Sequence, residues 1–152
     1  METIKQPPGS GLCLMACCAM VTGRDLNYVA DHSGPLGECS ESGIRYMKLA
    51  EAIRYLASEK LAVGAPLSWL EPQHFEAGVE LSAIIDTNEN SALIVVPSPT
   101  RPGGMHQVVW DHEARAVRDP HWQSPELTPL EDCEIIEWLH LWRIEEVDKL
   151  SG

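Results

Sequence analysis

Basic residues are scarce in this sequence: it has 11 lysines and arginines against 23 aspartates and glutamates, which gives a formal net charge of −12. Nucleic acids and anionic membranes attract basic surfaces, so this balance argues against both as partners. Long apolar runs are also missing, since no segment approaches the ~20 residues that cross a bilayer. No basic segment followed by an apolar one opens the chain, so we expect no secretory signal and a cytoplasmic location.

Paired cysteine motifs are absent as well. The five cysteines are an odd number, three of them lie in one segment (Cys13, Cys17 and Cys18), and no Cys-x-x-Cys pair occurs. This pattern favours free thiols in a reducing compartment over a disulfide framework, and it argues against a structural zinc site. We therefore expect no metal and no cofactor. The length of 152 residues predicts one domain that spans residues 1–152.

The stretch from residue 6 to residue 23 is the most informative part of the chain. Residues 7–11 are prolines, glycines and a serine, which predict a loop, and every residue from 12 to 21 is apolar or a cysteine. We expect a helix buried on all sides, with Cys13 in its first turn. The free N–H groups and positive dipole end of a helix start favour a thiolate, which is one way to make a nucleophile. From this stretch alone, a buried cysteine that serves only as a small hydrophobic side chain is an equally good interpretation.

Two further helices are predicted before any long strand. Asp25 is a plausible N-cap for a short helix over residues 26–32. Ser42 caps a longer predicted helix that runs to about residue 58, with an apolar residue every three or four positions. Its predicted buried face consists of Ile44, Met47, Ala50, Ile53, Leu56 and Ala57.

Strands are predicted in the second half of the chain. A β-branched run predicts a central strand over residues 92–96, and residues 105–110 and 115–119 predict a hairpin. Residues 135–144 predict a closing strand, with a helix as the alternative, and residues 61–70 hold a brief strand. Helices first and strands second are typical of the α+β class.

The predicted hairpin brings a histidine to a carboxylate. With its turn centred on residues 112–113, His106 lies directly opposite Asp119, and opposed residues hold their Cβ atoms ~4.5–5.5 Å apart. A carboxylate beside an imidazole fixes its tautomer and stabilises its charged form. His106 is therefore the predicted base for Cys13 and Asp119 its orienting group. His121 is the substitute base if the register differs, and a histidine that only forms an ion pair in a strand is the alternative interpretation.

Gln6 precedes Cys13 by seven residues, across the proline- and glycine-rich loop. Its amide can fold back and donate, together with the Cys13 backbone N–H, to a developing oxyanion. A solvated glutamine near the chain start is the alternative interpretation.

Taken together, these residues resemble the papain-like cysteine peptidases, most closely the C39-like group of bacteriocin-leader peptidases and their stand-alone relatives. The family pattern has a Gln and a short loop before Cys-Gly-Pro-Ala-Cys-Leu-Ala-Met-Val, then a His followed by a β-branched strand, then Asp-Pro. This sequence is similar, in the same order, in the segments that begin at Cys13, His106 and Asp119. It departs from the pattern at Leu14 and Met15, which stand in the places of Gly-Pro.

The resemblance implies a papain-like α+β fold, in which a buried N-terminal catalytic helix and further helices pack on a C-terminal antiparallel sheet. It implies Cys13 as nucleophile, His106 as base, Asp119 as orienting residue and Gln6 as part of the oxyanion hole. The spacing from Gln6 to Cys13 is one residue longer than in the family.

The function that the resemblance implies is hydrolysis of a peptide or isopeptide bond by a cysteine peptidase, with a peptide or protein as substrate. Deamidation or transamidation is an alternative, because it uses the same triad with a different acceptor. A second alternative is an inactive papain-like domain that binds proteins, which predicts a misaligned triad or an inert Cys13. The oligomeric state stays open.

Overall fold

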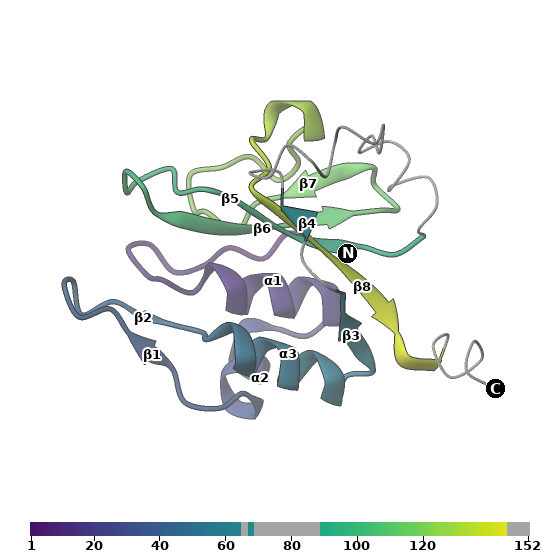
Figure 1. Ribbon diagram of the computed structural model, residues 1–152, viewed down its shortest axis with the longest axis horizontal. Helices are drawn as coiled ribbons and strands as arrows, with labels where there is room; N and C mark the ends of the chain where they lie inside the picture. The colour runs from purple at the N-terminus through teal and green to yellow at the C-terminus, as the bar shows by residue number, and fades with distance from the viewer. Residues whose placement is uncertain (65–66, 69–88, 146–152) are drawn as a thin grey trace.

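The computed structural model describes residues 1–64, 67–68 and 89–145 (Figure 1). The predicted α+β class is confirmed: the strands of the main sheet all follow the three helices, although the short strands β1 and β2 lie between α2 and α3. The elements are α1 (Cys13–Thr22), α2 (Leu26–His32), β1 (Gly37–Glu38), β2 (Arg45–Tyr46), α3 (Leu49–Ser58), β3 (Leu61–Val63), β4 (Leu67–Ser68), β5 (Ala92–Pro97), β6 (Met105–Asp111), β7 (Ala116–Arg118), the 3-10 helix η1 (Leu130–Asp132) and β8 (Glu137–Arg143). Residues 73–85, which the sequence leaves ambiguous between helix and loop, lie outside the described residues.

The main sheet is antiparallel, with strand order β3-β8-β5-β6-β7, and β4 also pairs with β8. Figure 1 shows all three helices on one side of this sheet, with α1 next to the strands and α2 and α3 farther away. Helix α1 contacts β6 on one side and α2 and α3 on the other. In the part of the chain that the structure describes, no helix is long and apolar enough to cross a membrane.

The predicted burial of the first helix is confirmed, because every residue of α1 from Leu14 to Met20 is buried. The apolar run of β5 has no alternation of apolar and polar residues, because both of its faces are buried. Leu93 and Val95 pack with α1 in one hydrophobic cluster, and Ala92 and Ile94 pack with Trp138 in a second cluster. Successive side chains of a strand point to opposite faces. Both faces of the sheet are therefore covered, and α1 is enclosed between the sheet and the outer helices.

The prediction for residues 43–58 is wrong in its first part. Residues 45 and 46 form β2, which pairs with β1, and α3 begins only at Leu49. The Ser42 hydroxyl accepts from the Ile44 N–H within a turn instead of capping the helix. Of the predicted buried face, Met47 and Leu56 are buried, but α3 buries Ala52 and Tyr55 beside Leu56, whereas Ile53 is 42% exposed.

Other predicted elements are confirmed. Asp25 caps α2 by accepting from the Tyr28 N–H at 2.7 Å, and β3, β5 and β8 form where strands are expected. The predicted hairpin forms as β6 and β7, but its predicted register is wrong. Asp111 pairs with Ala116 and Trp110 with Val117, which closes a four-residue loop with Arg115 at φ 53°.

The difference in register amounts to two residues. Side chains alternate between the two faces of a strand with a period of two, so this shift leaves every side chain on its predicted face. Asp119 follows β7 one residue after its end, and in the observed register it lies diagonal to His106 instead of directly opposite. A diagonal pair is still within reach of long side chains.

Candidate active site

Cys13 is the first residue of α1, as predicted, and it follows an N-cap residue, Leu12, that provides no side-chain cap. The N–H groups of the first turn of a helix have no partner within the helix, and here one of them serves the thiol. The backbone N–H groups of Leu14 and Gln107 and the His106 side chain all act on the Cys13 sulfur and favour its thiolate. The sulfur therefore lies where the helix start meets strand β6.

Gly11 holds the start of α1 against β2. It forms an isolated parallel bridge with Tyr46, and a Cβ at this position would lie 2.7 Å from the Arg45 carbonyl oxygen and from an Ile44 methyl carbon. No side chain fits in that space, because real Cβ atoms do not approach other atoms so closely. Glycine at position 11 thus allows β2 to support the loop that leads to Cys13.

His106 and Asp119 are joined by a short hydrogen bond of 2.6 Å between Nε2 and Oδ1. The carboxylate has further donors: the His121 backbone N–H reaches Oδ1 at 2.9 Å, and the Ser124 hydroxyl reaches Oδ2 at 2.9 Å. These bonds fix the orientation of the carboxylate, and the carboxylate in turn holds the imidazole. With Nε2 directed to Asp119, Nδ1 is the ring nitrogen available to Cys13.

The electrostatics of the three groups favour their charged forms. Burial would raise the pKa of the Cys13 thiol, but the hydrogen bond and charge of His106, with the two backbone N–H groups, outweigh it and lower the pKa below 9.0. Burial likewise would lower the pKa of His106, yet the hydrogen bonds to Asp119 and Cys13 raise it to about 9. The pKa of Asp119 falls because the bonds from His106, His121 and Ser124 outweigh its burial. An imidazolium between a thiolate and a carboxylate is the arrangement that these shifts support.

The other thiols differ sharply from Cys13. Burial raises the pKa of Cys17 well above its usual value and that of Cys18 to about 12, and it also raises the pKa of Cys133. The exception is Cys39, where hydrogen bonds from the Ser42 side chain and from the backbone of Ser42 and Glu41 lower the pKa. Two of the five cysteines therefore have thiols disposed to ionise.

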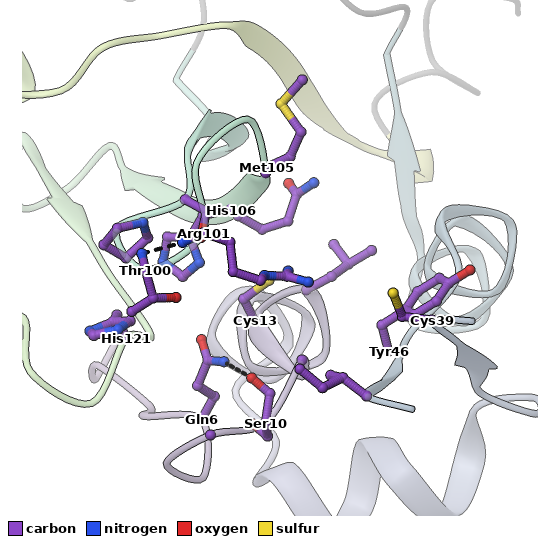
Figure 2. A pocket seen from close by; sticks show the side chains of 18 of the residues that line it. Gln6, Ser10, Cys13, Cys39, Tyr46, Thr100, Arg101, Met105, His106 and His121 are labelled. Carbon is purple, nitrogen blue, oxygen red and sulfur yellow. Dashed lines mark hydrogen bonds between the residues drawn. The ribbon is translucent and has the colours of Figure 1, made fainter. Parts of the chain in front are cut away.

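Gln6 is buried beside the triad and is not a solvated terminal residue. Its backbone N–H donates to the Pro120 carbonyl at 2.8 Å, next to Asp119, and its side-chain Nε2 donates to the Ser10 carbonyl at 2.8 Å. An amide nitrogen carries two hydrogens, so one remains for another acceptor. The amide oxygen is buried without a hydrogen-bond partner, and Figure 2 shows it turned away from Ser10.

Lys5 fastens this segment to the sheet side of the site. Its ammonium group donates to the carbonyl oxygens of Asp119 at 2.9 Å, His121 at 3.0 Å and Ser124 at 2.7 Å. The pKa of Lys5 is lowered by burial, in spite of the nearby charge of Asp119. The bonds of Lys5 and Gln6 therefore hold the N-terminal segment and the loop after Asp119 together.

A cleft of about 950 Å³ opens over the triad. Figure 2 shows Cys13 at its centre, His106 and His121 on one side, and Tyr46 and Cys39 on the other. Leu14 lines the cleft but is buried, and Met15 belongs to the hydrophobic core. Leu14 and Met15 therefore leave the cleft open above Cys13.

Several residues of this site were not predicted. Sequence reasoning named His121 only as a substitute base, whereas its ring stacks on Trp122 at 4.1 Å and meets His106 edge-on at 6.0 Å. Its Nδ1 accepts from the Gln123 N–H, and burial lowers its pKa, so it is disposed to be neutral. The position of His121, two residues after Asp119, is the signal that could have indicated that its side chain lies near His106. Nothing in the sequence marks Ser124 as part of the site.

Comparisons with known proteins identify no relative: no family model matches the chain, and neither the curated proteins nor the solved structures contain a match. Across residues 1–64, 67–68 and 89–145, no group of three histidine, cysteine or acidic side chains is arranged to hold a metal ion.

Proposed function

We propose that this protein is a papain-like cysteine hydrolase of the C39-like kind, which cleaves a peptide or isopeptide bond. The observation that carries the proposal is the grouping of three side chains: His106 bonds Asp119 at 2.6 Å and favours the Cys13 thiolate, and Cys13 and His106 both line an open cleft. A nucleophile at a helix start, a base within hydrogen-bond reach and a third group that orients the base are the components of covalent catalysis.

In the proposed acylation step, the Cys13 thiolate attacks the carbonyl carbon of the substrate. A C–S bond forms, and the carbonyl electron pair moves onto oxygen. The N–H of Cys13 and the second amide hydrogen of Gln6 are the proposed donors to this oxyanion. The C–N bond then breaks, and the His106 imidazolium gives its proton to the leaving amine, so that a thioester and a neutral imidazole remain.

In the proposed deacylation step, His106 acts as a base, whereas in acylation it acts as an acid. Water attacks the thioester carbonyl while His106 takes its proton, and the C–S bond breaks to release a carboxylic acid and the Cys13 thiolate. Asp119 stabilises the imidazolium at the start and at the end of the cycle. A deamidase or transamidase uses the same steps and differs in the bond that is broken or in the nucleophile that replaces water.

The protein-binding alternative predicts a misaligned triad or an inert Cys13. The bond between His106 and Asp119 and the lowered pKa of Cys13 count against it.

Turnover by wild type and by Cys13→Ala, measured side by side on peptide and isopeptide libraries, tests the proposal. We expect cleavage by wild type alone, and His106→Ala should lose nearly as much activity as Cys13→Ala because the two residues act as a unit. Mass analysis of products in water and with added amines separates hydrolysis from acyl transfer. Equal background from wild type and Cys13→Ala, together with a Cys13 that resists an activity-based electrophile, would instead support the binding role.

A further inference from the structure

The walls of the cleft carry few permanent charges. Among the described residues that line it, Arg101 is the one arginine or lysine and Glu41 the one carboxylate. Arg101 lies on the loop between β5 and β6, and Glu41 lies on the loop between β1 and β2. The cleft therefore has one cationic and one anionic side chain, on different loops, although the protein as a whole has 23 acidic and only 11 basic side chains.

The guanidinium of Arg101 has no carboxylate partner among the described residues. Three other arginines pair with acidic side chains: Arg24 with Glu59, Arg54 with Glu51 and Arg118 with Asp111. Arg101 is exposed, and Figure 2 shows its side chain extending from the β5–β6 loop toward Cys13. In an acidic protein, an arginine that shares a cleft with a reactive thiol and has no carboxylate partner in the described part of the chain is available to an anion from outside.

The loop that carries Arg101 is fixed by hydrogen bonds. The Ser98 hydroxyl accepts from the Arg101 N–H at 3.1 Å, and the Gly104 N–H donates to the Arg101 carbonyl at 3.0 Å. The Ser98 N–H closes the loop by donating to the Gly104 carbonyl at 2.8 Å. A Cβ at Gly104 would lie 3.1 Å from the Arg101 carbonyl oxygen, so the loop is also tightly packed. The backbone of Arg101 is thus held in place, and binding an anion restricts mainly its side chain.

We propose that Arg101 binds a carboxylate of the substrate close to the bond that Cys13 attacks. The inference rests on the proposed function, because it takes Cys13 as the reactive group, and it adds a substrate class: anionic peptides. A guanidinium matches a carboxylate with two parallel N–H···O bonds, which an ammonium group cannot reproduce. The carboxylate is either the C-terminal α-carboxylate of a peptide or the side chain of an aspartate or glutamate. The carboxylate of Glu41, on the β1–β2 loop, repels a substrate carboxylate. The substrate carboxylate is therefore expected on the Arg101 side of the cleft.

Alkylation of Cys13 by two small reagents of different charge tests this proposal without a known substrate. Iodoacetate carries a carboxylate, and iodoacetamide is its neutral counterpart, so the ratio of their rates at Cys13 reports the local charge. Both reagents attack the same thiolate, and the ratio therefore cancels any change in the ionised fraction of Cys13. Mass mapping assigns the label to Cys13 and separates it from the thiol of Cys39 in the same cleft.

We expect Arg101→Gln to lower the iodoacetate-to-iodoacetamide ratio by about three- to tenfold at low salt. Added salt should reduce the difference between wild type and variant. Arg101→Lys keeps the charge and should keep the ratio within about twofold of wild type. Arg143→Gln is the matched control, since Arg143 is also exposed but ends β8 and does not line the cleft. An unchanged ratio in Arg101→Gln, or an equal fall in Arg143→Gln, would overturn the proposal.

Matched peptides then identify the source of the carboxylate. One pair ends in a free carboxylate or in an amide, and a second pair has aspartate or asparagine next to the scissile bond. We expect wild type to cleave the acidic member of one pair faster than its neutral partner, and Arg101→Gln to lose that preference. Equal cleavage of both members of each pair by wild type would contradict the proposal. If wild type cleaves none of the peptides, the peptidase function fails, whereas the alkylation ratio still decides the role of Arg101.

Discussion

Replacing Asp119 with asparagine should raise the pH at which Cys13 becomes a thiolate. The Asp119 carboxylate lies 2.6 Å from the His106 imidazole, and its bond is the largest of the effects that raise the His106 pKa to about 9. An opposite charge at this range changes a pKa by roughly 1 to 3 units, which is worth ~1.4 to 4 kcal/mol of imidazolium stabilisation. Without that charge, the proton shared by the pair moves from the imidazole toward the sulfur.

The asparagine variant removes charge while it retains shape. An amide oxygen still accepts from His106 and from the His121 N–H, and the amide nitrogen can donate to the Ser124 hydroxyl in place of the bond that Asp119 accepts at 2.9 Å. The side chain therefore keeps its partners. A change in the thiolate titration then reports the lost charge and not a displaced loop, which a measurement of the unfolding temperature checks.

The ultraviolet absorbance of the thiolate, taken as the difference from Cys13→Ala, measures this effect. Wild type should show thiolate below the usual cysteine pKa of 9.0, because its pKa is lowered. In Asp119→Asn the midpoint should rise by about 1 to 3 units, and the His106 pKa should fall by a similar amount. Asp31→Asn, a change at an exposed carboxylate on α2, is the control. If Asp119→Asn gives the wild-type titration, Asp119 does not stabilise the imidazolium and the triad interpretation is wrong.

Three further measurements test other parts of the site. Iodoacetamide near neutral pH should label Cys13 and Cys39, whose pKa values are lowered, before Cys17 and Cys18, whose pKa values are raised by burial. The His106→Ala variant should be labelled more slowly at Cys13 only. Lys5→Met removes three hydrogen bonds shorter than or equal to 3.0 Å and should lower the free energy of unfolding in urea by about 1 to 3 kcal/mol; an unchanged midpoint would contradict this. Gln6→Ala should lower the turnover rate by ~10²–10³ if its amide donates to the oxyanion, whereas a change in KM alone would assign it to substrate binding.

The sequence was sufficient where a local pattern decides the structure. The apolar run before Gly23 predicts a buried helix with Cys13 at its start, and the β-branched run of residues 92–96 predicts a central strand; both are confirmed. The helix predicted over residues 43–58 is wrong in its first part, because its periodicity continues into residues 45 and 46, where pairing with β1 determines the backbone instead. A helical period cannot reveal strand partners that lie seven and nine residues away in the sequence.

The hairpin shows a different limit. Its register was predicted two residues away from the observed pairing of Asp111 with Ala116, because the turn is centred between residues 113 and 114 and not on residues 112–113, and the sequence alone does not fix that centre. The prediction that His106 meets Asp119 nevertheless holds, since a shift of two preserves the face of each side chain. A shift of one residue would have separated the two side chains and left His121 as the candidate base.

The bonds of the Lys5 ammonium and of the Gln6 backbone N–H to the segment that begins at Asp119 could not be predicted, because they join residues more than 110 positions apart. Under the proposed papain-like function, they explain how the site accommodates one residue more between Gln6 and Cys13 than the resemblance implies. Gln6 is held by the Pro120 carbonyl on the sheet side, and Cys13 by the start of α1. The chain between these fixed points turns through Gly9, at φ 75°, with the Ser10 N–H bonded to the Pro7 carbonyl. An added residue lengthens this turn and leaves both ends in place, so the position of the Gln6 amide depends on the loop after Asp119 and not on its distance along the chain from Cys13.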